Sequence, residues 1–178
     1  SANFLAGEML LDQSDLCIDK AAECYINMHE LAKASKMFVM MAEGCKESNL
    51  RRFNAKSKLF MSILCELAIT MEFEAVTLSQ ALDWKGDPRV RDKEEEEEEM
   101  KKATLVEFQR VEKIKYDEIL SKVKNYEEID YMWANCKEQL FVKNIIRFRL
   151  TYDKHEFADH LYHWNMVRPF DRIQLRLI

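Results

Sequence analysis

The sequence predicts an all-α fold, made of antiparallel helix hairpins that stack as an α-solenoid. Three observations support this prediction. Apolar residues recur at three- and four-residue intervals along most of the 178-residue chain, which is the period of one helix face. With only 3 glycines and 2 prolines, the chain has few of the turn residues that a β-sandwich or barrel needs. A hydrophobic fraction of 48% and a charged fraction of 33% are typical of a folded protein.

The most informative stretch covers residues 15–45. Ser14 and Asp15 can cap a helix by accepting hydrogen bonds from its first backbone N–H groups, so we expect a first helix from Asp15. A turn at residues 28–30 would lead into a second helix. The apolar face of this pair would consist of Leu16, Ile18, Ala21, Ala22, Tyr25, Met28, Leu31, Ala34, Met37, Phe38, Met41 and Ala42. The alanines on this face would let the two helix backbones approach closely, as an antiparallel hairpin requires.

This stretch resembles a degenerate tetratricopeptide repeat. Ala22, Tyr25, Ala34 and Phe38 have the spacing of the small and aromatic residues of that motif. The stretch departs from the motif in lacking its early Trp and its helix-ending Pro. The resemblance implies a tetratricopeptide-like solenoid that binds protein partners in its concave groove.

The rest of the N-terminal half predicts further hairpins. An apolar stripe over residues 4–10 would belong to the second helix of a preceding repeat. Residues 50–70 and 73–84 would form another pair around a turn at Met71 and Glu72. The inner side of the first of these helices would carry Phe53, Leu59, Phe60, Ile63, Leu64 and Leu67. Gly86-Asp87-Pro88 would then interrupt the chain, because Gly ends helices and Pro begins them.

The second half begins with the acidic run Glu94–Glu99, which is the exposed start of a long helix, a flexible acidic loop or a specific site for a cation or basic peptide. The helical alternative is favoured by Glu98 and Lys102, which have the spacing of an i,i+4 ion pair. The apolar residues expected on this helix are Leu105, Phe108, Val111, Ile114, Ile119 and Val123. Two further helices would follow, one over residues 129–148 after a break at 125–127 and one after a cap at 151–153. The residues after Pro169 fit either a short helix, which the helical context favours, or an alternating strand.

We therefore divide the chain into three parts. Residues 1–85 would form tetratricopeptide-like hairpins, and residues 86–99 an acidic linker or the start of the long helix. Residues 100–178 would form further helical pairs with a basic C-terminal end. The abrupt ends suggest a piece of a longer array.

Charge and cysteine usage restrict the function. A net charge of −5 argues against general attraction to nucleic acid or to anionic membranes. The five cysteines are an odd number and lie among apolar residues, which predicts buried, reduced thiols and a cytoplasmic setting. No stretch approaches the eighteen or so apolar residues of a membrane span.

One cluster of residues has the chemistry of a metal site. Glu156, His160 and His163 would share one helix face, and two imidazoles with a carboxylate are a reasonable ligand set for iron or zinc. The alternative is that they are ordinary polar residues beside a packing stripe. Their spacing matches no common helical metal motif, so we expect no metal and no cofactor.

Basic residues gather toward the C-terminus. From Phe141 onward there are seven Lys or Arg residues against four Asp or Glu residues. The candidate binding residues are Lys143, Arg147, Arg149, Arg168, Arg172 and Arg176. Together with interleaved aromatic rings they could bind RNA by phosphate contacts and stacking. Alternatively, their aliphatic stems cover a buried aromatic stripe while the charges reach water.

These observations predict a non-catalytic interaction scaffold or adaptor with several protein partners in an intracellular assembly. The first alternative is an RNA-binding helical repeat that uses the basic C-terminal residues. The second is a helical metalloprotein built on the histidine cluster. The sequence contains no glycine-rich phosphate loop and no nucleophile motif, which argues against an enzyme.

Overall fold

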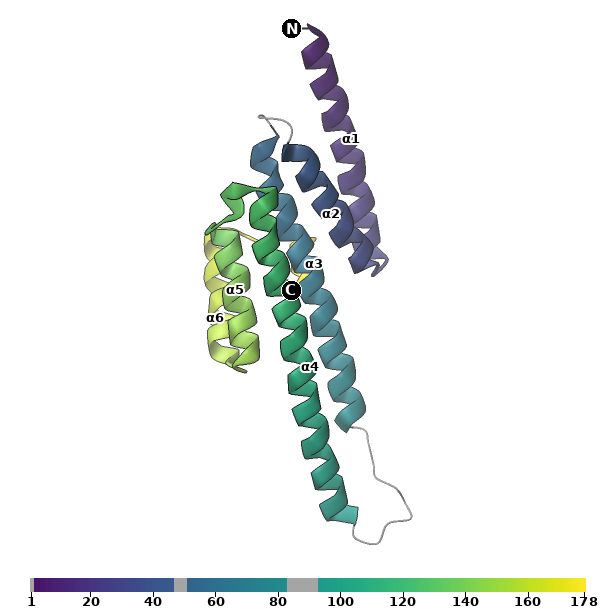
Figure 1. Cartoon of the computed structure of the whole chain (residues 1–178), viewed down its shortest axis with the longest axis vertical. Coiled ribbons are helices and arrows are strands. Elements are labelled where there is room, and N and C mark those ends of the chain that lie inside the picture. The colour runs from purple at the N-terminus through teal and green to yellow at the C-terminus, as the bar shows by residue number, and fades with distance from the viewer. Residues whose placement is uncertain (1, 47–50, 83–92) are drawn as a thin grey trace.

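The computed structural model describes residues 2–46, 51–82 and 93–178, and these form helices without any strand (Figure 1). The helices are α1 (Ala2–Asn27), α2 (Leu31–Lys46), α3 (Arg52–Leu82), α4 (Lys93–Ile129), α5 (Lys137–Leu150), α6 (Lys154–Val167) and α7 (Gln174–Leu177). A single 3₁₀ turn, η1 (Tyr131–Trp133), joins α4 to α5. The predicted all-α class is therefore confirmed.

Successive helices fold back on one another as antiparallel pairs (Figure 1). The longest two, α3 and α4, lie side by side, and the shorter α5–α6 hairpin packs beside one half of α4. One continuous core of buried side chains extends from Ala22 in α1 to Leu177 in α7. α7 returns to α3, so Leu177 is buried although it lies next to the end of the sequence.

The first hairpin forms as predicted, although Leu16 and Met28, which were expected on its apolar face, are 57% and 60% exposed. α1 ends at Asn27, and His29 adopts a φ of 59°, in the left-handed region, to turn the chain into α2. Ala22, Ala34 and Phe38 are buried, and Tyr25 is half-buried beneath the Lys33 ammonium, 5.7 Å from the ring centroid. Small residues at the crossing and an aromatic ring beside them close the hairpin, as the tetratricopeptide-like pattern predicts.

The start of the first helix was predicted wrongly. α1 begins at Ala2 and not at Asp15, so residues 4–10 belong to the same helix and not to a preceding repeat. Ser14 and Asp15 do not cap the helix, because both lie within α1. Asp15 pairs with Arg51, and Asp19 accepts a hydrogen bond from Lys58 Nζ at 2.6 Å, so these carboxylates tie α1 to the segment that begins α3.

Two predicted breaks are absent. α3 continues through Met71 and Glu72, since both are good helix formers and no Gly or Pro interrupts them. α4 likewise continues through residues 125–127, where the ring of Tyr126 is buried. Phe53 is 72% exposed and was wrongly placed on the inner side of its helix. The Gly86-Asp87-Pro88 break lies outside the described residues.

The acidic run does form the start of a long helix. α4 begins at Lys93, and Glu98 pairs with Lys102 at 3.9 Å across one helical turn. Glu99 is exposed as well. The helical alternative for this run is therefore confirmed, and the flexible loop is not.

The five cysteines are free, but they are not all buried. Cys17 and Cys24 are exposed on α1, which corrects the prediction for these two. Cys45 and Cys65 are buried, and burial raises the pKa of Cys65 to about 12. Among the described helices, none combines the length and apolarity that crossing a bilayer requires.

A buried network of hydroxyl groups fixes the three central helices against one another. Ser35 of α2 and Ser62 of α3 are hydrogen-bonded at 2.9 Å, and Ser62 in turn bonds the Tyr126 hydroxyl of α4 at 2.8 Å. Ser35 also donates to Glu66 at 2.8 Å. Because buried polar groups cost free energy when unpaired, this network favours one alignment of α2, α3 and α4.

Candidate functional site

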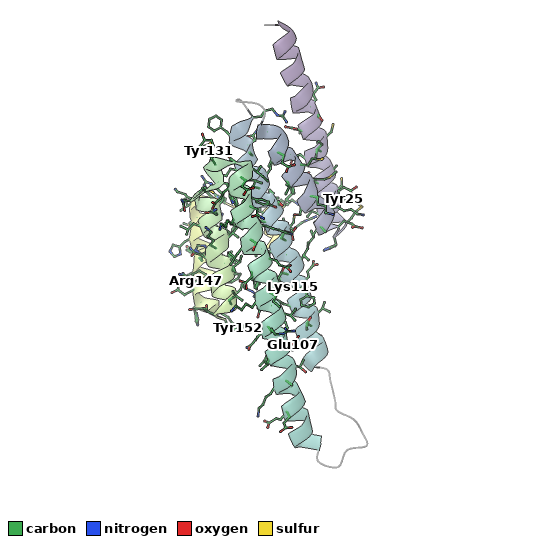
Figure 2. All side chains as sticks on the ribbon, in the orientation of Figure 1. Tyr25, Glu107, Lys115, Tyr131, Arg147 and Tyr152 are labelled. Atoms are coloured by element: carbon green, nitrogen blue, oxygen red, sulfur yellow. The ribbon has the colours of Figure 1, made fainter. Side chains whose placement is uncertain are left out.

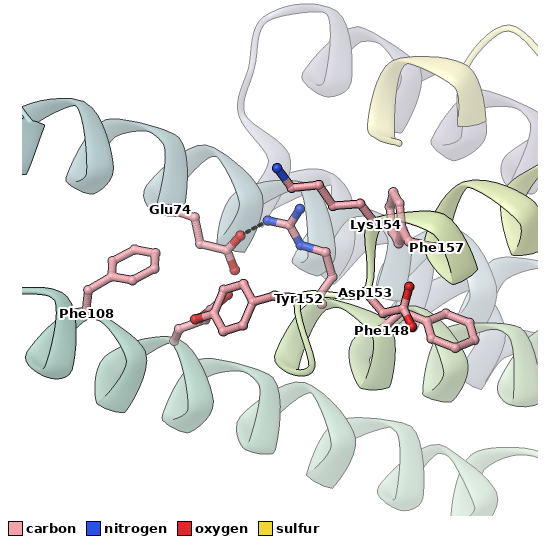
Figure 3. Close-up of a pocket in the computed structure, with 9 residues that line it drawn as sticks. Glu74, Phe108, Phe148, Tyr152, Asp153, Lys154 and Phe157 are labelled. Carbon is pink, nitrogen blue, oxygen red and sulfur yellow. Dashed lines mark hydrogen bonds and ion pairs between the residues drawn. The ribbon is translucent and has the colours of Figure 1, made fainter.

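The α5–α6 hairpin meets the long helices at a cavity of about 310 Å³, which we name the α3–α5 cavity (Figure 3). Its lining residues are Glu74 of α3, Phe108 and Glu112 of α4, Phe148 and Arg149 of α5, Tyr152 and Asp153 of the following turn, and Lys154 and Phe157 of α6. Figure 2 labels Tyr152 where the α5–α6 turn approaches α4. The φ of Tyr152 is 55°, in the left-handed region, and this conformation carries the chain around the turn.

Buried charges line one side of the cavity. Glu74 and Glu112 are each 2% exposed. Arg149 pairs with Glu74, and its Nε–H also donates to the Tyr116 hydroxyl at 3.3 Å. The other carboxylate, Glu112, accepts a hydrogen bond from the Tyr152 hydroxyl. Side chains from α3, α4, α5 and the turn before α6 thus meet in one polar cluster, which lies beside the aromatic residues of the cavity.

Burial shifts the protonation of these groups. Burial raises the pKa of Glu112, and the neighbouring charge of Glu74 raises it further, against a lowering effect of the Tyr152 hydrogen bond. Burial and the hydrogen bond to Glu112 raise the pKa of Tyr152 to about 12. The Tyr152 hydroxyl therefore remains protonated at neutral pH and donates to the carboxylate.

A second hollow lies on the outer side of the α5–α6 hairpin, and we name it the α5–α6 groove. Its lining residues are Lys137, Leu140, Phe141, Asn144, His160, His163, Trp164, Val167 and Arg168. Leu140 is 57% exposed and Val167 is 73% exposed, so two aliphatic side chains face solvent at its rim. Trp164 packs on Phe141 with ring centroids 4.3 Å apart and forms an aromatic floor.

The histidines predicted as metal ligands belong to this groove. His160 stacks on Phe141 with ring centroids 5.0 Å apart, and burial lowers its pKa, so the ring is neutral at neutral pH. The His163 Nδ1 atom hydrogen-bonds the Asp159 backbone carbonyl at 2.7 Å, and Glu156 is exposed. Among the described residues, no three His, Cys, Asp or Glu side chains are grouped closely enough to hold a metal ion.

Four of the six predicted basic residues have hydrogen-bond or ion-pair partners within the chain. Arg149 pairs with Glu74, Arg168 with Glu138, and Arg176 with Asn27. Lys143 donates to the Gln139 side chain at 3.0 Å. Arg147 and Arg172 are exposed, and Figure 2 labels Arg147 at the α5–α6 hairpin. The six residues do not form one basic surface, and their RNA-binding role stays a prediction.

Sequence reasoning missed both carboxylates of the cavity, although a signal was present. Glu74 continues the buried series Phe60, Ile63, Leu67 and Thr70 at helical spacing. Along α4, Glu112 lies one turn from each of two buried aromatic residues, Phe108 and Tyr116. A carboxylate on an otherwise buried face is costly unless it is paired, so such positions indicate a partner or a site.

The comparisons give the family. The family model described as "SNAP: Soluble NSF attachment protein, SNAP" matches residues 1–96, which is more than half of the chain and includes α1, α2 and α3. No curated protein and no solved structure matches the chain. Members of the family are tetratricopeptide-like helical proteins that act as non-catalytic adaptors and bind protein partners. The chain belongs to the soluble NSF attachment protein family.

Proposed function

We propose that this protein is an adaptor that attaches NSF to SNARE-containing assemblies and has no catalytic activity of its own. The observation that carries the proposal is the family match over residues 1–96. The stacked hairpins support it, since solenoids present extended surfaces to protein partners. Five free cysteines suit a reducing compartment, and the adaptor would accordingly work in the cytoplasm.

The α5–α6 groove is the surface that we assign to a protein partner. Leu140 and Val167 expose aliphatic carbon beside the aromatic floor, which is the composition of an interface centre. Lys137 and Arg168 stand at the same groove and would favour a partner segment that carries acidic residues next to apolar ones.

Binding of purified NSF to the immobilised chain, with and without SNARE proteins, tests the proposal. We expect saturable binding that Val167→Asp weakens at least tenfold, because a charge would enter the apolar rim. Val106→Asp is the matched control, since Val106 is 66% exposed on α4 and lines none of the hollows described above. Absence of NSF binding under both conditions would remove the function. Equal NSF binding by Val167→Asp and Val106→Asp would show that the α5–α6 groove is not the binding surface.

A further inference from the structure

The α3–α5 cavity contains an acceptor atom that the chain leaves unused. One oxygen of Glu74 holds Arg149, and the carboxylate also lies against the Tyr116 hydroxyl and the Glu112 carboxyl. Its other oxygen, Oε1, is buried and is assigned no hydrogen-bond donor among the described residues. Figure 3 shows the carboxylate among the residues that line the cavity, with its ion pair to Arg149 dashed. An unpaired buried acceptor costs free energy, so a group that donates to it from the cavity would be stabilised.

The charge of the lining selects a cation. Three carboxylates, Glu74, Glu112 and Asp153, face two basic groups, Arg149 and Lys154, which leaves a formal charge of −1. One guanidinium or ammonium group would make the lining neutral and supply the missing donor. An anion or a neutral acceptor would instead leave the Glu74 oxygen unpaired.

The walls also suit an organic cation. The aromatic residues that line the cavity are Phe108, Phe148, Tyr152 and Phe157. Rings around a carboxylate bind guanidinium and ammonium groups through their π faces. The chain already uses this contact nearby, since the Arg149 guanidinium lies 5.9 Å from the Phe157 ring centroid and the Lys115 ammonium 3.8 Å from that of Phe73. A bare metal ion would gain nothing from such walls.

The cavity is large enough for a side chain. Its volume of about 310 Å³ far exceeds the ~10–15 Å³ that one water molecule requires. Tyr152 is 52% exposed, so one wall borders solvent and a ligand can enter without unfolding the hairpin.

We propose that the α3–α5 cavity binds the cationic side chain of one lysine or arginine of a protein partner. The choice of a protein over a free amine rests on the proposed adaptor function. The site itself is distinct from the α5–α6 groove, and eight of its nine lining residues lie beyond the family match. The partner's aliphatic stem would contact the rings, while its charged end would donate to Glu74 and approach Glu112.

NMR titration of the whole ¹⁵N-labelled chain tests the site. The probes are acetyl-Gly-Arg-Gly-amide, acetyl-Gly-Lys-Gly-amide and the neutral norleucine analogue, with methylguanidine as the free cation. We expect both cationic peptides to shift amide signals of residues 108–112 and 148–157, and the norleucine peptide to leave them unchanged. Equal shifts with the neutral peptide would overturn the charge argument. Shifts with methylguanidine but not with either peptide would overturn the assignment to a protein side chain.

A matched pair of variants locates the charge. Glu112→Gln keeps the shape and the acceptor for Tyr152 but removes one negative charge, so peptide affinity should fall about tenfold or more. Glu118→Gln removes a charge from the exposed face of the same helix and should change affinity less than about twofold. Equal affinities for the two variants would refute the site.

The cavity proposal and the adaptor proposal can be refuted independently of each other. If the peptides do not bind while the same preparation binds NSF, the cavity proposal is wrong and the adaptor function stands. If the peptides bind but NSF does not, the cavity is a cation site and the adaptor function is wrong. A protonated Glu112 that donates to the Glu74 oxygen would also satisfy the unused acceptor, and in that case no peptide would bind at millimolar concentration.

Discussion

The first hairpin makes a quantitative prediction about two phenylalanines. Phe38 is 2% exposed in the core between α1, α2 and α3, whereas Phe53 is 72% exposed on α3. Phe38→Ala removes a ring that buries ~150–200 Å² at about 25 cal/mol/Å², which corresponds to about 4–5 kcal/mol. Measured Phe→Ala substitutions in cores cost about 3–5 kcal/mol, so we expect a loss within that range. Phe53→Ala should change the free energy of unfolding by less than about 0.5 kcal/mol.

Urea denaturation followed by circular dichroism measures both values. With a slope of about 2 kcal/mol/M, a loss of about 4 kcal/mol lowers the unfolding midpoint by about 2 M urea. The two variants delete the same atoms, so their difference isolates burial from residue type. A loss below about 1 kcal/mol for Phe38→Ala, or equal losses for both variants, would contradict the packing of the first hairpin.

Three further predictions concern buried polar groups and thiols. Burial alone would raise the pKa of Glu138, but its backbone N–H, Lys56 and Arg168 hold it below its ordinary value. The ionised Glu138 carboxylate therefore stabilises the folded state fully above the pKa of about 4.3 that it has in the unfolded chain. This stabilisation is lost as the pH falls through the lower pKa that Glu138 has in the folded state. Unfolding midpoints between pH 3 and 6 should vary less in Glu138→Gln, and equal pH dependence would contradict this. Tyr126→Phe should cost about 1 kcal/mol in urea denaturation, because one buried hydrogen bond is lost, and no loss would contradict that bond. In maleimide labelling mapped by mass spectrometry, the exposed cysteines should react well before Cys65, and simultaneous reaction would show that Cys65 is accessible.

The sequence predicted the hairpin of residues 15–45 because its evidence is local. Small residues at Ala22 and Ala34 and a ring at Phe38 lie within one hairpin, and their spacing alone determines the contact. Helix ends were predicted less well. A helix start was proposed at Asp15 and a turn at Met71, but both residues are compatible with the interior of a helix, and α1 and α3 continue through them. A polar residue among apolar ones marks a helix end only when its side chain has no tertiary partner, and Asp15 has one in Arg51.

The cavity could not be predicted in the same way because its parts are distant in sequence. Glu74 and Arg149 are 75 positions apart, and Tyr152 meets Glu112 across 40 positions. Each residue alone fits an ordinary amphipathic helix. The basic C-terminal residues illustrate the same limit, since their charge was visible but the internal partners of Arg149 and Arg168 were not.

Buried ion pairs join the α5–α6 hairpin to the part of the chain that matches the family. Arg149 of α5 pairs with Glu74 of α3, and Glu138 of α5 lies 3.5 Å from Lys56 of α3 while it also pairs with Arg168. Such pairs add little net stability, because desolvation offsets their attraction, but breaking one leaves a buried charge unpaired. Their effect is therefore to penalise any other placement of the hairpin. Since the cavity and the groove are both built on α5 and α6, the same pairs that orient the hairpin also determine the geometry of both sites.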